Sequence, residues 1–250
     1  MLRHRGQRRT YTHNLRLAGL LCSTAGFVNG AGFLAFAVLT TNVTGHVALF
    51  AERISKGDFS AAQTVGLWML LFLLGAFVCS LLVGKIGRHQ QYAYVIPIFI
   101  EILILLFIAV YGYELNNTNL QAEVFAGSLL FAMGLQNAMV TMVSGAVVRT
   151  THLTGMFTDL GIELSAVLYS KRTDKKGLKQ KIILRTVIIS FFIAGGILGA
   201  YLFTHITYGA FFIPVAILIF TMFYDIFRVH AVKMARRIKR NVFIISSRKA

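Results

Sequence analysis

AGFVNG at residues 25–30 returns as MGLQNA at residues 133–138, and each copy is followed by a second shared motif, TTNVTG at 40–45 and TTHLTG at 150–155. The two copies lie about 110 residues apart and keep the same order, which indicates an internal repeat. Each copy is expected to contain three membrane spans. Because three is odd, a tandem pair crosses the bilayer in opposite senses, which predicts two inverted repeats.

Composition places the chain in a membrane. Hydrophobic residues make up 56% and charged residues 14%, with a mean hydropathy of +0.70, whereas soluble domains carry roughly 25% charged residues. Six stretches approach the roughly 20 apolar residues that a spanning helix needs. They run approximately from Leu17 to Leu39, Gln63 to Gly84, Tyr92 to Gly112, Ala122 to Val148, Ile182 to Thr204 and Tyr208 to Phe227.

The net charge of +16 follows the expected topology. Of the 25 Lys and Arg residues, 23 fall in segments on one side of the six spans, and only Arg53 and Lys56 fall on the other. This asymmetry predicts that both termini are cytoplasmic. Since the basic residues alternate with spans and form no single patch, we expect no nucleic-acid partner. The tail either contacts anionic lipid headgroups or acts only as an anchor.

The repeat and the charges together define the expected organisation. Residues 171–181, KRTDKKGLKQK, form a basic insertion in the second copy, and we expect a flexible cytoplasmic loop there. The segments are a basic cytoplasmic N-terminus (1–16), the first repeat (17–112), an external loop (113–121), the second repeat (122–227) and a basic cytoplasmic tail (228–250).

Amides recur at the same depth in both copies. Asn29 lies about halfway along the first expected span, and Gln136 and Asn137 lie about halfway along the fourth. Amides at the membrane midplane must be satisfied internally. They either join helices by hydrogen bonds or face each other and line a shared polar site.

Small residues four positions apart predict close helix contacts, because they allow two backbones to touch. The pairs are Gly26 with Gly30, Gly75 with Cys79 and Gly195 with Gly199.

The TT-x-x-TG motifs are expected to begin new helices. Their hydroxyl and amide groups can cap a helix start, and the free N–H groups of such a start favour anions. These helices either dip into the bilayer from opposite sides or lie at its surface. The candidate substrate-binding residues here are Thr41, Asn42, Thr44, Gly45, Thr151, His152, Thr154 and Gly155.

Ionisable residues inside the spans are also candidates. Glu101 lies at the centre of the third span, where a carboxylate is costly, and we assign it a role in ion coupling. Asp159 and Glu163 share a helical face; Asp159 either contacts substrate or pairs with Arg149. The spacing of His, Cys and acidic residues predicts no metal site and no cofactor, and no enzyme motif is present.

The stretches GFVNGAGFLAF, TTNVTGHVALF and GLQNAMVTMVSGAVVRTTHLTGMFTDLGIEL resemble the two signature regions of the YoaK-like family of bacterial multi-pass membrane proteins. The resemblance extends from about Leu17 to Phe227. It implies six spans and a location in the bacterial inner membrane, and it implies no particular substrate.

We therefore predict an all-α integral membrane protein of six transmembrane helices in two inverted repeats. The expected activity is secondary transport of a small polar or anionic solute, with proton coupling through Glu101. The alternative is a membrane scaffold or sensor that transports nothing. A protein of only six spans is small for enclosing a transport path by itself, which favours a homodimer.

Overall fold

The computed structural model describes residues 11–87, 93–114, 119–169 and 175–224, and every regular element in these ranges is helical. The all-α prediction is confirmed for this part of the chain. The α-helices are α1 (Tyr11–Phe36), α2 (Val43–Ser55), α3 (Phe59–Ile86), α4 (Val95–Tyr111), α5 (Asn119–Ser144), α6 (Leu153–Tyr169) and α7 (Lys175–Ile206). Two 3-10 helices, η2 (Gly112–Glu114) and η4 (Thr207–Phe211), follow α4 and α7, and residues 212–224 are again α-helical.

Five helical runs in the described residues are long and apolar enough to cross a membrane. Four of them are formed by α1, α3, α4 with η2, and α5. The fifth, Gly177–Tyr224, has 48 residues, or about 72 Å at 1.5 Å per residue, against about 30 Å for the hydrocarbon core. This run is interrupted by η4, which begins at Thr207 with a φ of 46°.

The two repeat-bearing helices end in the same way. α1 ends at Phe36 and α5 at Ser144, a few residues earlier than expected from hydropathy. Ala37 (φ 55°) and Ala146 (φ 64°) follow these ends. Positive φ values in residues other than glycine are uncommon and cannot continue a right-handed helix. The chain therefore turns at matched places, just before each TT-x-x-TG motif.

Two expected loops are partly helical. Residues 171–181 are not a loop throughout, because residues from Lys175 onward belong to α7; Lys, Leu and Gln are good helix formers. In segment 113–121, which was expected to be an external loop, η2 ends at Glu114 and α5 begins at Asn119. The expected basic tail (228–250) lies outside the described residues.

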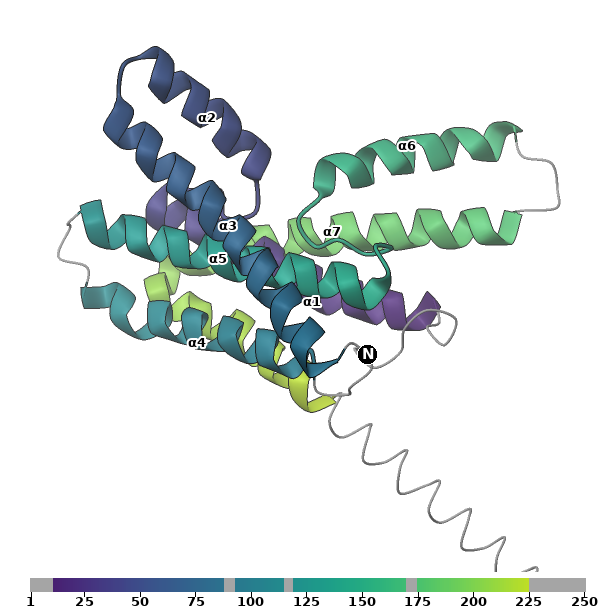
Figure 1. Cartoon of the computed structure of the whole chain (residues 1–250). Helices are drawn as coiled ribbons and strands as arrows, with labels where there is room; N and C mark the ends of the chain where they lie inside the picture. Colours follow the sequence, from purple (N-terminus) through teal and green to yellow (C-terminus); the bar gives the residue numbers. More distant parts are fainter. Residues whose placement is uncertain (1–10, 88–92, 115–118, 170–174, 225–250) are drawn as a thin grey trace, which may run out of the picture.

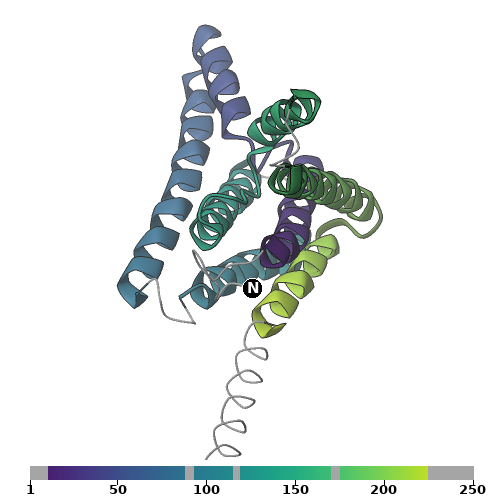
Figure 2. The same cartoon turned by 90° about the vertical axis from the view of Figure 1, so that its right-hand side faces the viewer.

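The long helices pack in two crossed pairs, α1 with α7 and α3 with α5 (Figures 1 and 2). A β-carbon added at Gly26 would overlap the Phe192 carbonyl of α7, and one at Gly134 would overlap the Phe72 carbonyl of α3. The predicted close glycine contacts are thus confirmed. In each pair the partner helix comes from the other copy of the repeat.

The centre of the molecule is formed by α1 and α5. In the most apolar segments of α1 and α5, 67% of the residues are buried, whereas in that of α3 only 17% are buried. Leu67, Leu70 and Leu73 of α3 are exposed, as expected of side chains that face lipid. Figure 1 shows two hairpins beside this centre, α2 with α3 and α6 with α7, with the starts of α2 and α6 directed towards the middle.

Candidate functional site

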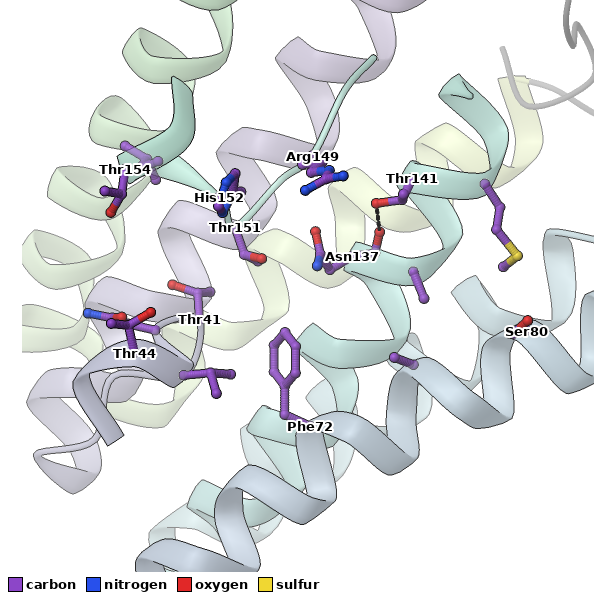
Figure 3. Close-up of a pocket in the computed structure, with 16 residues that line it drawn as sticks. Thr41, Thr44, Phe72, Ser80, Asn137, Thr141, Arg149, Thr151, His152 and Thr154 are labelled. Atoms are coloured by element: carbon purple, nitrogen blue, oxygen red, sulfur yellow. Dashed lines mark hydrogen bonds between the residues drawn. The ribbon is translucent and has the colours of Figure 1, made fainter. Parts of the chain in front are cut away.

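A cavity of about 620 Å³ lies where α2 and α6 begin, beside α3 and α5 (Figure 3). Its wall contains residues of both TT-x-x-TG motifs, which are about 110 positions apart in the sequence. The structure therefore brings seven of the predicted site residues together. They are Thr41, Asn42, Thr44, Asn137, Thr151, His152 and Thr154.

The first motif begins α2 with a side-chain cap, as predicted. The Oδ1 atom of Asn42 accepts a hydrogen bond of 3.0 Å from the backbone N–H of Gly45. Gly45 thus lies in the first turn of α2, and its N–H is already used. Caps of this kind satisfy one of the donors that a helix start leaves free, so the motif fixes where α2 begins.

Asn29 of α1 makes hydrogen bonds to the same motif. Its Oδ1 accepts hydrogen bonds from the Thr41 hydroxyl (2.9 Å) and from the Thr41 backbone N–H (3.2 Å). Asn29 is not part of the cavity wall. In the structure this predicted site residue positions the motif and does not line the cavity.

The second motif is held differently. Met156 donates its backbone N–H to the His152 carbonyl (3.1 Å) at the start of α6, and the His152 imidazole lies against Gly155. The Thr141 hydroxyl donates to the Asn137 backbone carbonyl (2.7 Å). However, the buried Oδ1 of Asn137 accepts no hydrogen bond from the described residues, so the amide oxygen that corresponds to that of Asn29 is unsatisfied.

Besides Asn29, Gly45 and Gly155, three more predicted site residues are absent from the cavity wall. Gln136 is fully buried and donates to the Leu21 carbonyl of α1 (2.7 Å), which joins α5 to α1. Asp159 does not pair with Arg149, as one alternative had it; its carboxylate and that of Glu163 pair with Arg185, at 3.0 and 3.2 Å. Arg185 is within reach because α6 folds back along α7.

Glu101 is the third of these residues. Its side chain on α4 is fully buried, and neither carboxylate oxygen has a hydrogen-bond partner among the described residues. It is not part of the cavity wall. A carboxyl group in this setting is costly unless it is protonated or binds a cation.

Sequence reasoning missed three polar members of the wall, namely Ser80, Thr141 and Arg149 as a cavity residue. Arg149 follows a turn that Ser144 stabilises, since the Ser144 hydroxyl accepts from the Val148 N–H at 3.0 Å. The signal available in the sequence was that Arg149 directly precedes the second motif, as RTTHLTG shows. Ser80 is recognisable only once α3 is placed beside α5.

The cavity suits an anion. Its wall has the Arg149 guanidinium, several hydroxyl groups and the His152 ring, and no Asp or Glu belongs to it. The starts of α2 and α6 add the partial positive charge of helix N-termini. Among the described residues, no three His, Cys, Asp or Glu side chains are grouped to hold a metal ion.

The fold and the cavity define an all-helical transmembrane protein with a polar site at the start of two short helices. The chain belongs to the family described as "Protein of unknown function (DUF1275)", which it matches over residues 17–224. It is 27% identical over 186 residues to the UPF0700 transmembrane protein YoaK of Bacillus subtilis (strain 168), covering 74% of this chain and 81% of that protein. The resemblance to the YoaK-like family is therefore confirmed. No solved structure matches the chain.

Proposed function

We propose that this protein is a secondary transporter of a small anionic or polar solute in the bacterial inner membrane. The observation that carries the proposal is the convergence of both TT-x-x-TG motifs on one cavity that also contains Arg149. Carriers built from inverted repeats place their solute site in this way, at the starts of broken helices near the midplane.

The helix pairing supports inverted repeats. Gly26 and Phe192 meet as Gly134 and Phe72 do, with the roles of the two copies exchanged. The short helices also match, because each of α2 and α6 follows a helix whose last residue is followed, within two positions, by an alanine with positive φ. α2 has 13 residues and α6 has 17, about 20 and 26 Å. Each is shorter than the hydrocarbon core, as expected for helices that start inside it.

Six spans follow if the run Gly177–Tyr224 crosses twice. Its length of 48 residues and the interruption at η4 support two crossings. Both termini are then cytoplasmic, in agreement with the charge asymmetry. In this orientation the cavity lies towards the cytoplasmic side, because Ser80 of α3 and Thr141 of α5 are close to the cytoplasmic ends of their helices.

Arg149 provides the test of anion binding. We expect a screen of small carboxylates, phosphate and sulfate on the detergent-purified protein to find anions that raise its melting temperature, because a ligand that binds the folded state stabilises it. Arg149→Ala should weaken binding of such an anion about 10- to 100-fold, since hydrogen bonds to charged groups contribute about 1.5–3 kcal/mol. Uptake of the same anion into proteoliposomes should fall in parallel.

Lys56→Ala is the matched control. It also removes one positive charge, but Lys56 is exposed, pairs with Glu52 and lies outside the cavity wall. If no anion stabilises the protein, or if Arg149→Ala and Lys56→Ala bind an anion equally well, the cavity is not an anion site.

A membrane scaffold or sensor is the second candidate function. It is favoured by Asn29 and Gln136, whose side chains make hydrogen bonds within the protein as purely structural amides would. Proteoliposome uptake separates the two functions. A protein that binds an anion through Arg149 and shows no uptake in either direction is a sensor.

A further inference from the structure

The two crossed helix pairs are built from equivalent residues, but they are not in the same state. Positions 26 and 134 correspond, as do positions 72 and 192, and the glycine contacts at these positions are alike in both pairs. One helical turn further along, the pairs differ. A β-carbon added at Gly30 would overlap the Gly196 carbonyl. The corresponding residues of the other pair, Ala138 and Ala76, line the cavity.

The hydrogen bonds of the two motifs also differ between the two copies. In the first copy, Asn29 accepts two hydrogen bonds from Thr41. The corresponding residues of the second copy are Asn137 and Thr151. Both line the cavity, and the Oδ1 of Asn137 accepts nothing from the described residues. Figure 3 shows the Asn137 amide, Thr151 and Arg149 around the same open space. One amide–hydroxyl contact is thus made and its counterpart is not.

From this difference we propose that the protein has a second cavity, closed in this structure, between α1 and α7 on the opposite side of the α2 and α6 starts. It opens when the Asn29–Thr41 contact breaks and α7 separates from α1 at Gly30. The Asn137–Thr151 contact then forms and closes the first cavity. The proposal rests on the inverted repeats of the proposed transport function and names the residues that exchange.

The composition of the second cavity follows from the correspondence. Ala200 takes the place of Ser80, Phe33 that of Thr141 and Leu39 that of Arg149. The two motif starts are common to both cavities, and Arg149 belongs to the first one alone. A solute would therefore remain at the motif starts while access changes from one side to the other, and it would meet fewer polar groups on the second side.

The test measures access to each cavity in the full-length chain. Cys22 and Cys79, which are both buried, are first replaced by alanine. Single reporters are then introduced as Ser80→Cys for the first cavity and Ala200→Cys for the second. A membrane-impermeant maleimide is applied to inverted membrane vesicles, which expose the cytoplasmic side, and to spheroplasts, which expose the external side. The rate of labelling reports how often each cavity is open.

Thr41→Val removes the hydroxyl of the formed contact and keeps the side-chain shape. We expect it to raise external labelling of the Ala200→Cys reporter and to lower cytoplasmic labelling of the Ser80→Cys reporter, each about two- to tenfold, as the loss of one hydrogen bond implies. Thr151→Val is the matched control. It removes the Asn137–Thr151 contact proposed for the state in which the second cavity is open. It should therefore lower external labelling of the Ala200→Cys reporter, and cytoplasmic labelling of the Ser80→Cys reporter should stay the same or rise.

Gly30→Ala gives an independent second variant should Thr41→Val fail to fold. It places a β-carbon against the Gly196 carbonyl, which should open the α1–α7 pair and raise external labelling. Its counterpart Ala138→Gly should not. If the threonine variants change both reporters alike, or if neither folded variant moves either reporter, no such exchange occurs.

These outcomes are separate from those of the transport test, because labelling needs no solute. If the variants exchange access between the two cavities but the protein takes up no anion, the second cavity is supported and the proposed solute is refuted. Anion uptake with labelling that no variant alters would refute the exchange and leave transport standing.

Discussion

Glu101 is a fully buried carboxyl group in an apolar helix, and both of its oxygens are without hydrogen-bond partners in the described residues. A charged carboxylate at the bilayer centre costs about 2.5–3.5 kcal/mol on insertion scales. By contrast, Glu163 is also buried but pairs with Arg185 at 3.2 Å. The two acids therefore have different roles to test, one in proton coupling and one in holding α6 against α7.

Glu101→Gln is expected to preserve the fold and to abolish the pH dependence of anion uptake. Glutamine resembles the protonated acid in shape but cannot release a proton. The control Glu163→Gln should lower the melting temperature, because it removes the buried one of the two carboxylates that pair with the half-buried Arg185. Melting temperature and uptake are measured on both variants from about pH 4 to about pH 8, which covers the ordinary titration of carboxyl and histidine side chains. A large stability loss in Glu101→Gln, or unchanged pH dependence, would remove Glu101 from the coupling step.

At the scale of elements, the fold depends on long helices that touch through glycine. Gly26, Gly75, Gly134, Gly195 and Gly199 each face a backbone carbonyl of the partner helix. Without a hydrophobic driving force inside a bilayer, such close packing is a main source of helix association. The short helices α2 and α6 make no such contacts with each other, so their positions depend on their partners α3 and α7.

Gly134→Ala is expected to destabilise the protein by about 1–3 kcal/mol, because its β-carbon would overlap the Phe72 carbonyl and overpacking costs about this much. Gly84→Ala is the control. A β-carbon at Gly84 meets nothing within 4 Å, so this variant should be neutral or slightly more stable. Thermal unfolding in detergent checks both. Equal melting temperatures would mean that the α3–α5 contact does not govern stability.

At the scale of the whole molecule, the number of spans decides the topology. Reporter fusions should place residue 250 and the N-terminus in the cytoplasm, together with the basic stretch around Lys179, because 23 of 25 Lys and Arg residues fall in the segments expected on that side. An external C-terminus would require an odd number of crossings. It would show that Gly177–Tyr224 spans the membrane once, and the inverted repeats would be refuted.

The sequence predicted those features that each copy encodes locally. The helix starts at the TT-x-x-TG motifs, the Asn42 cap and the four-residue spacing of the contact glycines all depend on residues within one or two helical turns. Which helix each glycine face meets was not predictable, because the partner lies in the other copy. The pairing of Asp159 with Arg185 was not predictable, because it requires α6 to fold back along α7. The difference between the Asn29–Thr41 pair and the Asn137–Thr151 pair was also hidden, since similar motifs encode both and only the packing around them differs.

The pairing of helices across the two copies also determines how the chain must be assembled. If the chain inserts as it is synthesised, the glycine faces of α1 and α3 lack their partners α7 and α5 at the time when residues 17–112 have entered the membrane. The first repeat is then in the bilayer with its helix-contact surfaces exposed to lipid. It reaches its native arrangement only after α7 has been inserted. A single copy expressed alone is not expected to fold, whereas the two copies expressed as separate chains carry all the surfaces needed to find each other.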